Sequence, residues 1–514
     1  MTSRRTFLAA SLSLAGAACT PLRRVDAARK FSSDPFTLGI ASGYPTSDGI
    51  VLWTRLVPEP LTPDGGMRDS VVPVQWEIAT DEKMTAVIRK GTEYATSEWA
   101  HSVHVELEGL EPSRDYWYRF TAGHARSVIG RTRTAPPSRA PLASLKVAVA
   151  SCQQYEHGYF NAYRQMIADN PDLIVHVGDY IYELSWGETR IRHHNTPETF
   201  TLEDYRARYA LYKSDADLAA AHAACPWLVI WDDHEVENDY AGDTSEEDDE
   251  PGLFLARRAA AYRAYYEHMP LPRRMVPFGP QMRLHTQRAF GDLASIYLID
   301  QRQYRSREAC PPSGRAGSSR VTNCAELDLP ERTMLGTRQE AWLHAALGRS
   351  RTRWNLLAQG TVMAHIDEKI GADKAYWTDA WNGYPAARSR LVNYLSEHEV
   401  ANPVVLSGDI HAFMVNQLNL RPDDLESPVV AAEFVTTSIS SQGTPQKVLD
   451  TWRASNANLL FADGEHRGYT RLDLTHERMV GSLIAMDSVT DPHAMGRALK
   501  TVVVEAGRPE PKPA

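Results

Sequence analysis

The sequence lacks an excess of basic residues and lacks an apolar run long enough to be a permanent membrane anchor. Lys and Arg number 55 against 65 Asp and Glu, which gives a formal net charge of −10. This balance excludes a broad nucleic-acid-binding face, so a phosphate-bearing partner would have to be held by local metal charge. The apolar run near the amino terminus, Leu8 to Ala18, is too short to span a bilayer, and no transmembrane domain is expected after signal removal.

The amino terminus resembles a twin-arginine export signal, because Arg4 and Arg5 precede that short apolar run. We expect residues 1–30 to be recognised by the twin-arginine translocase, so that the protein is periplasmic or secreted. The alternative is a basic segment before a membrane helix. Cys19 follows small residues, as in a lipoprotein cleavage site, but Gly16 stands where such sites usually carry Leu. Lipid anchoring at Cys19 is therefore an alternative, not the favoured prediction.

Cysteine is also scarce, with five residues in the whole chain. Apart from the one in the export signal, Cys152 follows a predicted strand and is a candidate for the functional site. Cys225 lies in an Ala-rich, helix-like stretch and is expected to be a buried structural residue. Cys310 and Cys324 flank a loop rich in Pro, Gly and Ser. In an oxidising periplasm, a disulfide bond closing that loop is reasonable.

Residues 36–135 are predicted to form a small all-β domain. Apolar and polar residues alternate over Val72–Ile78, as in half-buried strands. A Leu-Glu-Pro segment just before Tyr116 resembles the tyrosine corner of fibronectin type III sandwiches. The same alternation predicts that His101 and His104 are solvent-facing strand residues and not metal ligands.

The rest of the chain, residues 145–505, is predicted to be a larger domain that begins with a βαβ unit. Val147–Ala150 and Leu173–Val177 are apolar runs separated by a helix-like segment. The carboxyl ends of two such parallel strands lie at one edge of a sheet, so Cys152 and Asp179 should lie close together there. Tyr182 follows three residues later. A thiol, a carboxylate and a phenol at one edge are anionic donors that suit a trivalent metal, above all iron.

Two later strand ends carry donors of the same kind. The strand that ends at Trp231 is followed by Asp233 and His234 in a run of polar residues. A further strand ends in Gly-Asp-Ile-His, with Asp409 and His411 predicted to alternate on an extended backbone and to point the same way. Chance does not easily explain four strand ends that all carry metal-binding side chains.

Two other features have less certain roles on sequence alone. Arg302 and Arg305 follow a buried-looking strand, where they could contact a substrate phosphate or pair with local carboxylates. Thr337 and Glu340 have the spacing of a capping box, which predicts a helix that begins there and runs to about Leu347.

The four motifs together resemble those of PhoD-type alkaline phosphatases, among the calcineurin-like metallophosphoesterases and purple acid phosphatases. They are Ser151-Cys152-Gln153, Gly178-Asp179-Tyr180-Ile181-Tyr182, the run from Trp231 to Asn238, and Gly408-Asp409-Ile410-His411. The resemblance implies an α/β fold, in which a four-layer α/β/β/α metallophosphoesterase domain follows a small immunoglobulin-like or fibronectin-III-like sandwich.

The resemblance also assigns roles to the site residues. It implies that Asp179 bridges two metals and that Cys152, Tyr182 and His411 bind Fe(III). The second site would use Asp233 and Asp409, with Asn238 as a further ligand. Cys152 and Asp409 stand where the wider superfamily usually carries Asp and His. Carboxylate in place of His favours a harder second metal, so one or two Ca(II) ions are expected in preference to zinc.

One further position departs from the relatives, which often carry Asp where this chain has Asn382. That change removes a charge near the expected pocket and leaves the role of the position open.

The predicted reaction is hydrolysis of a phosphate monoester or diester by water that the metal pair activates, with no phosphorylated enzyme residue. His234 is the candidate catalytic residue, for stabilising the transition state or protonating the leaving group. One alternative is a phosphodiesterase or phospholipase D-like enzyme acting on lipid or cell-wall diesters. Another is a cell-surface binding protein whose metals are only structural.

Overall fold

The computed structural model describes residues 25–26, 29–62, 64–67, 69–187, 189–369 and 373–514. Almost all of the predicted export signal, including both arginines and Cys19, lies outside these residues. Within the described residues, no helix combines the length and the apolar character needed to cross a bilayer.

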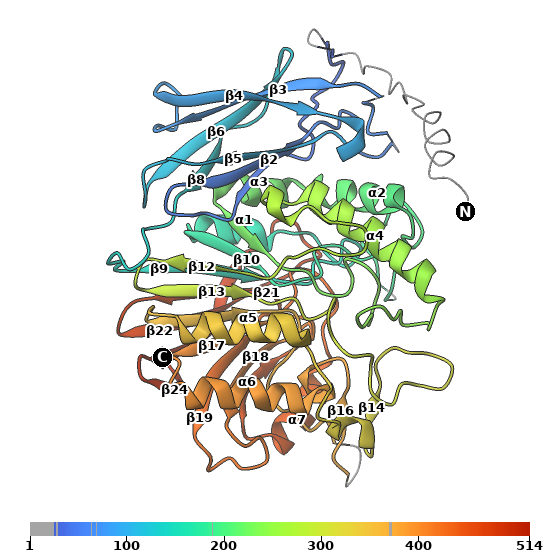
Figure 1. Ribbon diagram of the computed structural model, residues 1–514, viewed down its shortest axis with the longest axis vertical. Helices are drawn as coiled ribbons and strands as arrows, with labels where there is room; N and C mark the ends of the chain where they lie inside the picture. Colours follow the sequence, from blue (N-terminus) through green and yellow to red (C-terminus); the bar gives the residue numbers. More distant parts are fainter. Residues whose placement is uncertain (1–24, 27–28, 63, 68, 188, 370–372) are drawn as a thin grey trace, which may run out of the picture.

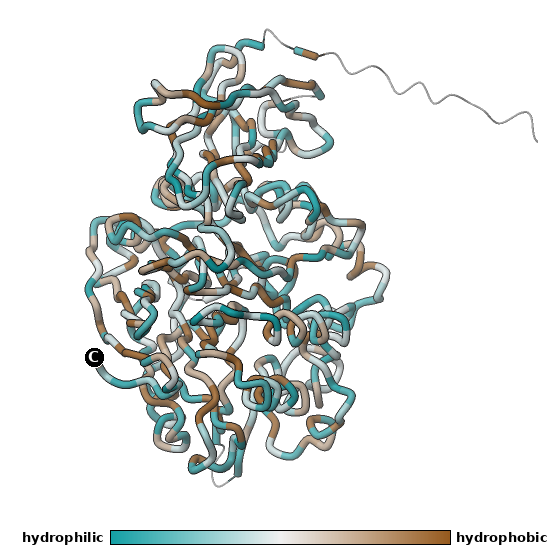
Figure 2. The backbone as a smooth tube through the Cα atoms, turned by 60° about the vertical axis from the view of Figure 1, so that its left-hand side comes forward, coloured by the Kyte–Doolittle hydropathy of each residue, from teal (hydrophilic) through white to brown (hydrophobic). Residues whose placement is uncertain are grey.

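The amino-terminal region is rich in strands and projects from one end of the molecule (Figures 1 and 2). Its buried side chains form an apolar cluster of their own. The predicted tyrosine corner is confirmed, because the Tyr116 hydroxyl accepts a hydrogen bond of 2.8 Å from the Glu111 N–H. The strands are β1 (Ile40–Gly43), β2 (Ile50–Arg55), β3 (Val72–Ala79), β4 (Val87–Ala95), β5 (Ser102–Leu107), β6 (Asp115–Ala122), β7 (Ala125–Arg126) and β8 (Gly130–Arg133).

The prediction that His101 and His104 face solvent is wrong, because both side chains are buried. His104 Nδ1 lies 3.0 Å from the Leu271 carbonyl oxygen, and its ring stacks on Tyr266 at 4.3 Å. Strands β1, β2 and β5 extend the large sheet of the following region. The face that alternation assigned to solvent is therefore covered by a segment from that region.

Two large sheets form the rest of the fold. In the ten-stranded sheet the order is β24-β23-β22-β21-β9-β10-β11-β1-β2-β5, and in the seven-stranded sheet it is β12-β13-β15-β17-β19-β18-β20. Strands β9, β10 and β11 are parallel, as are β13, β15, β17 and β19. The ten-stranded sheet adds β9 (Leu145–Ala150), β10 (Leu173–His176), β11 (Trp227–Val229), β21 (Arg467–Leu474), β22 (Arg478–Met486), β23 (Gly496–Glu505) and β24 (Arg508–Pro513). The seven-stranded sheet consists of β12 (Thr286–Phe290), β13 (Ala294–Leu298), β15 (Trp354–Ala358), β17 (Pro403–Ser407), β18 (Phe413–Asn419), β19 (Val429–Val435) and β20 (Leu459–Asp463). The strands β14 (Arg320–Val321) and β16 (Tyr376–Trp377) pair with each other in a separate sheet.

The seven-stranded sheet buries both faces. Ile296 and Leu356 point to one face and share an apolar cluster with Val147 of the ten-stranded sheet. Their neighbours Tyr297 and Leu357 point to the other face and pack with side chains of α5 and α6. Burial on both faces explains why these strands are continuously apolar in the sequence. The helices are α1 (Ala162–Ala168), α2 (Leu202–Lys213), α3 (Ala216–Ala224), α4 (Pro251–His268), α5 (Gly336–Gly348), α6 (Pro385–Glu397) and α7 (Gln446–Ser455).

The βαβ prediction is confirmed, since α1 connects β9 to the parallel strand β10. The predicted capping box of α5 is wrong. This helix begins at Gly336 after Leu335, so Thr337 lies inside its first turn and no side chain caps it from the N-cap position. A capping box does form at α2, between Thr201 and Asp204.

Candidate metal centre

The site lies where the parallel strands of both sheets end. Beyond β9 and β10, the Cys152 N–H donates to the Gly178 carbonyl oxygen at 3.1 Å. Gly178 has a positive φ of 115°, and a Cβ there would lie 2.5 Å from that of Asp232. Glycine is thus needed for the end of β10 to approach the segment after β11. From the other sheet, the Gly408 N–H donates to the Gly360 carbonyl oxygen at 2.6 Å.

Four of the predicted ligands have left-handed backbone conformations. The φ angles are 56° at Cys152, 56° at Asp179, 65° at Asp409 and 55° at His411. The prediction that Asp409 and His411 alternate on an extended backbone is therefore wrong. Residues other than glycine adopt this conformation at a cost in free energy. Such strained residues tend to occur where a side chain must be oriented toward a functional site.

Cys152, Asp179 and His411 form the first group of candidate ligands. Each offers one atom, and these atoms lie within 4.8 Å of one another. The Tyr182 hydroxyl joins them, at 3.1 Å from Asp179 Oδ2 and 2.8 Å from His411 Nε2. It also accepts a hydrogen bond of 2.9 Å from Ser441 Oγ. The structure thus brings together the thiol, carboxylate, phenol and imidazole that the sequence indicated.

The imidazole of His411 is held in one orientation. Its Nδ1 lies 2.8 Å from the Gln442 carbonyl oxygen, which makes Nδ1 the donor and leaves Nε2 with its lone pair toward Tyr182 and the other ligands. Burial lowers the pKa of His411 to about 3. A neutral imidazole fixed through its second nitrogen is the form that binds metals.

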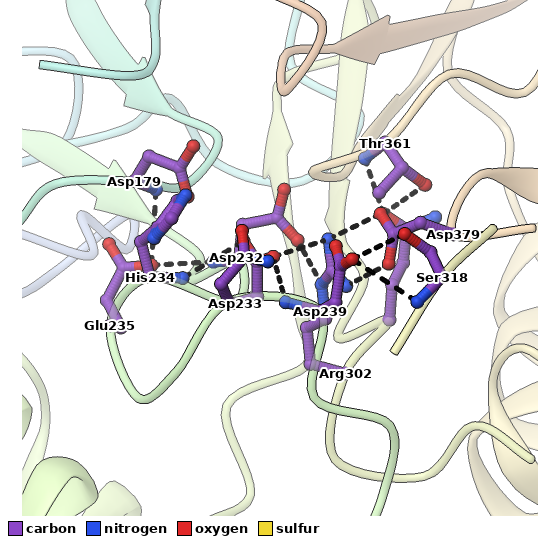
Figure 3. Close-up of polar contacts among 12 residues, drawn as sticks. Asp179, Asp232, Asp233, His234, Glu235, Asp239, Arg302, Ser318, Thr361 and Asp379 are labelled. Atoms are coloured by element: carbon purple, nitrogen blue, oxygen red, sulfur yellow. Dashed lines mark hydrogen bonds and ion pairs between the residues drawn. The ribbon is translucent and has the colours of Figure 1, made fainter. Parts of the chain in front are cut away.

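Asp179 belongs to a second group as well, with Asp233 and His234. Figure 3 shows these residues along the ends of β10 and β11. His234 Nδ1 lies 2.7 Å from Oε2 of the fully buried Glu183, whose Oε1 accepts a bond from the Asn238 N–H at 2.8 Å. His234 Nε2 makes no hydrogen bond within the described chain. Glu183 therefore fixes the ring and leaves Nε2 without a hydrogen-bond partner.

A third group consists of Asp233, Asp239 and Asp379. The hydroxyl of Ser318 donates to Asp239 Oδ2, and Asp239 donates its N–H to Asp233 Oδ2 at 2.7 Å. Ser318 lies in the loop between Cys310 and Cys324, which are joined by the expected disulfide bond. The disulfide-closed loop therefore reaches the site (Figure 3).

Arg302 and Arg305 pair with carboxylates, which is one of the two roles that the sequence left open for them. Arg302 is fully buried and bonds to Asp232 and Asp379, with a guanidinium nitrogen also 3.5 Å from Asp233 Oδ2. Arg305 lies 2.7 Å from Asp379 Oδ1. The guanidinium groups thus hold the acidic side chains in place.

The comparisons with known proteins agree with this geometry. The family model described as PhoD-like phosphatase matches residues 147–483, and the model of the N-terminal domain of PhoD-like phosphatases matches residues 22–136. The chain belongs to the PhoD-like phosphatase family. It is 46% identical over 478 residues to alkaline phosphatase D of Bacillus subtilis (strain 168), an alignment that covers 91% of this chain and 81% of that protein.

A solved structure of PhoD superposes on the chain with a TM-score of 0.90 at 43% identity, covering 95% of this chain and 93% of that one. As a PhoD-like phosphatase, the chain is a metal-dependent hydrolase of phosphoric esters. Family membership therefore favours an enzyme over the alternative of a binding protein.

Two predicted ligands of this PhoD-like phosphatase lie apart from the three groups. The Asp409 carboxylate belongs to none of the three groups. Its charge interacts electrostatically with that of Asp232. Asn238 donates its N–H to Glu183 Oε1 at 2.8 Å. Their roles as ligands stay predictions.

The candidate ligands fit a cation in place among them. Burial, with the charge of Asp179, raises the pKa of the Cys152 thiol well above its usual value. Burial likewise raises the pKa values of Asp179 and Tyr182. Asp179 Oδ1 is buried and has no hydrogen-bond partner. A bound metal ion would supply that partner and stabilise the deprotonated ligands.

Proposed function

We propose that the chain is a secreted alkaline phosphatase that hydrolyses phosphate esters at a centre of Fe(III) and one or two Ca(II) ions. The observation that carries the proposal is the position of Asp179, which belongs to two ligand groups at once. A carboxylate shared in this way suits a bridge between two metals. When bound, the metals would supply an activated water and neutralise charge on the phosphoryl oxygens.

The ligand types support iron in the first position. Cys152 and Tyr182 are anionic donors when deprotonated, and with His411 and Asp179 they give a set that suits Fe(III). The second position is assigned to Asp233 and Asp409, with Asn238 as a further ligand. Oxygen donors of this kind suit Ca(II).

His234 is proposed as the residue that donates a proton to the leaving group. Its Nδ1 is held by Glu183 at 2.7 Å, which leaves Nε2 free on the side of Asp179 and Asp233. The side chain is 13% exposed. An imidazole held through one nitrogen and open at the other is arranged for transfer of a proton.

The proposal also includes export of the protein and a four-layer arrangement of its larger domain. The disulfide bond between Cys310 and Cys324 supports an oxidising compartment, as export through the twin-arginine pathway would provide. The apolar clusters on both faces of the seven-stranded sheet support the four-layer α/β/β/α arrangement. The two family matches support domain boundaries near 36–135 and 145–505.

Elemental analysis of the exported protein, combined with its visible spectrum, tests the metal assignment. Iron with calcium and a thiolate or phenolate charge-transfer band are expected, whereas a colourless protein containing only zinc would overturn the proposal. Cys152→Ala and Asp179→Asn should abolish activity on p-nitrophenyl phosphate. Cys225→Ala is the matched control, because Cys225 is buried but lies outside all three ligand groups.

The ester class needs a separate assay. Rates on p-nitrophenyl phosphate and bis-p-nitrophenyl phosphate should be compared for the same preparation. A faster diester reaction would favour the phosphodiesterase alternative within the same metal chemistry.

A further inference from the structure

A large open cleft lies outside the three ligand groups, between α4, β12 and the start of α5. Its volume is about 810 Å³, within the range of small-molecule sites. Figure 1 shows β12 and β13 between the two helices. Arg258 from α4, His285 before β12 and Trp342 from α5 are among its lining residues.

The cleft is basic although the chain is acidic overall. Arg274, Arg283 and Arg338 line it with exposed side chains, and none of them forms an ion pair with a described residue. None of the described residues that line the cleft is acidic. Arg302 and Arg305 at the metal centre are paired with carboxylates, whereas three unpaired guanidinium groups around one cavity indicate an anionic ligand.

The first turn of α5 adds backbone donors to the same cleft. Leu335, at the N-cap, offers no side-chain acceptor, and the following residues Gly336, Thr337 and Arg338 line the cavity. The Gly336 N–H is bonded to Thr333 Oγ1 at 2.9 Å. The N–H groups of Thr337 and Arg338 lack intrahelical acceptors, and the positive end of the helix dipole favours an anion there.

An independent observation comes from His285, whose side chain is buried except for 9% of its surface. Its Nδ1 is buried and has no hydrogen-bond partner, and the ring makes no other hydrogen bond within the described chain. It contacts the rings of Trp342 at 4.9 Å and Tyr304 at 5.9 Å. His285 thus adds an imidazole without a hydrogen-bond partner to the wall of the basic cleft.

The aromatic residues define the other part of that ligand. Trp342 and Tyr304 line the cleft, and Phe278 at its edge is 86% exposed. An exposed aromatic side chain beside a pocket is a common feature of binding sites.

We propose that this cleft is a second, non-catalytic site that binds an organic phosphate. The phosphate would lie between Arg283, Arg338 and the first turn of α5, and its apolar or aromatic group would pack on Trp342.

None of the residues of the three ligand groups lines the cleft, and two of its lining residues are hydrogen-bonded to segments next to the metal centre. Gln303 bonds to the Met282 carbonyl oxygen at 2.7 Å and to Asp300 Oδ2 at 2.9 Å. Arg258 donates to the carbonyl oxygen of Gly242, whose N–H bonds to the Arg302 carbonyl at 2.9 Å. The site thus goes beyond the proposed hydrolysis and does not depend on it.

Calorimetric titration of the metal-loaded protein with phenylphosphonate, which phosphatases cannot hydrolyse, tests the proposal. We expect two sites per wild-type chain, one at the metal centre and one in the cleft. The Arg283→Ala/Arg338→Ala variant should weaken binding at one site by about tenfold or more, with kcat and KM on p-nitrophenyl phosphate unchanged. His285→Ala should weaken the same site.

The Arg349→Ala/Arg478→Ala variant is the matched control, since both arginines are exposed, outside the cleft and not ion-paired with described residues. It should keep both sites. The proposal would be overturned if the Arg283→Ala/Arg338→Ala variant kept every site of the wild type with unchanged affinity, whether the wild type has one site or two. Methylphosphonate should bind the cleft more weakly than phenylphosphonate, and equal binding would refute the role assigned to Trp342.

Discussion

The Tyr182 hydroxyl lies 2.8 Å from His411 Nε2, although 229 positions separate the two residues in the sequence. Tyr182 follows a strand of the ten-stranded sheet, and His411 follows a strand of the seven-stranded sheet. The contact therefore joins the two sheets at the point where their parallel strands end. A metal bound by both side chains would connect the two sheets in the same place.

Tyr182→Phe should remove one of the proposed anionic iron ligands and leave the packing of the ring. We expect iron content or its visible band to fall, and kcat to drop by at least about tenfold. Metal analysis and kinetics on one preparation measure both. Tyr240→Phe is a suitable control, because the buried Tyr240 hydroxyl bonds to that of Tyr262 and lies outside the ligand groups. Full activity with an unchanged spectrum in Tyr182→Phe would contradict the assignment.

The sequence predicts the ligands that follow strands better than those that come from loops. Cys152, Asp179 and Asp233 could be placed together because parallel strands bring their carboxyl ends to one edge. Asp239 and Asp379 are not among the ligands predicted from the sequence. They lie in irregular segments, whose path depends on tertiary contacts and not on apolar periodicity.

Two local predictions from alternation are wrong. Asp409 has a left-handed backbone, which period-two alternation cannot reveal. His104 has the alternation of an exposed residue, but α4 and the segment after it cover that face. At His104, contacts distant in sequence override the local pattern.

Glu183 also escaped prediction, although it directly follows Tyr182. One of its carboxylate oxygens contacts Nδ1 of the His234 ring, and the other accepts a hydrogen bond from the Asn238 N–H. Nothing in its spacing separates it from a surface glutamate. Only its full burial beside His234 identifies its role.

Removal of the Arg302 charge should destabilise the protein strongly. Arg302→Met leaves Asp232 and Asp233 buried without this cation, and it leaves Asp379 paired with Arg305 alone. Breaking a buried pair in this way typically costs about 3–5 kcal/mol. Urea unfolding of the wild type and the variant measures the difference. Arg497→Met, which breaks the pair between Arg497 and Asp487, both more than half exposed, should cost about 1 kcal/mol or less. Equal effects of the two variants would contradict the account.

The disulfide bond should contribute both stability and activity. Cys310→Ser/Cys324→Ser opens a loop whose ends are 14 positions apart, for which chain entropy gives about 3 kcal/mol. Activity should also fall, because Ser318 in that loop orients Asp239. Ser318→Ala keeps the disulfide bond, so it should reduce activity with a much smaller loss of unfolding free energy. A double Cys variant with wild-type stability and activity would refute both roles.

Lys213 should make the free energy of unfolding depend on pH in the alkaline range. Burial lowers its pKa from 10.5 to about 7, and its ammonium nitrogen lies 4.4 Å from the Trp53 ring centre and 3.4 Å from the Tyr180 hydroxyl.

Between about pH 7 and pH 10.5 the unfolded chain binds a proton at Lys213 that the folded chain does not bind. The free energy of unfolding should therefore rise with pH across this window, and the penalty should be fully present below it. Lys213→Met fills similar space without the charge. Its unfolding free energy should exceed that of the wild type at pH 7 by several kcal/mol, on the order of 3–5. The two curves should converge as the pH approaches 10.5, which urea unfolding at a series of pH values measures. Parallel curves would show that Lys213 keeps its ordinary pKa in the folded protein.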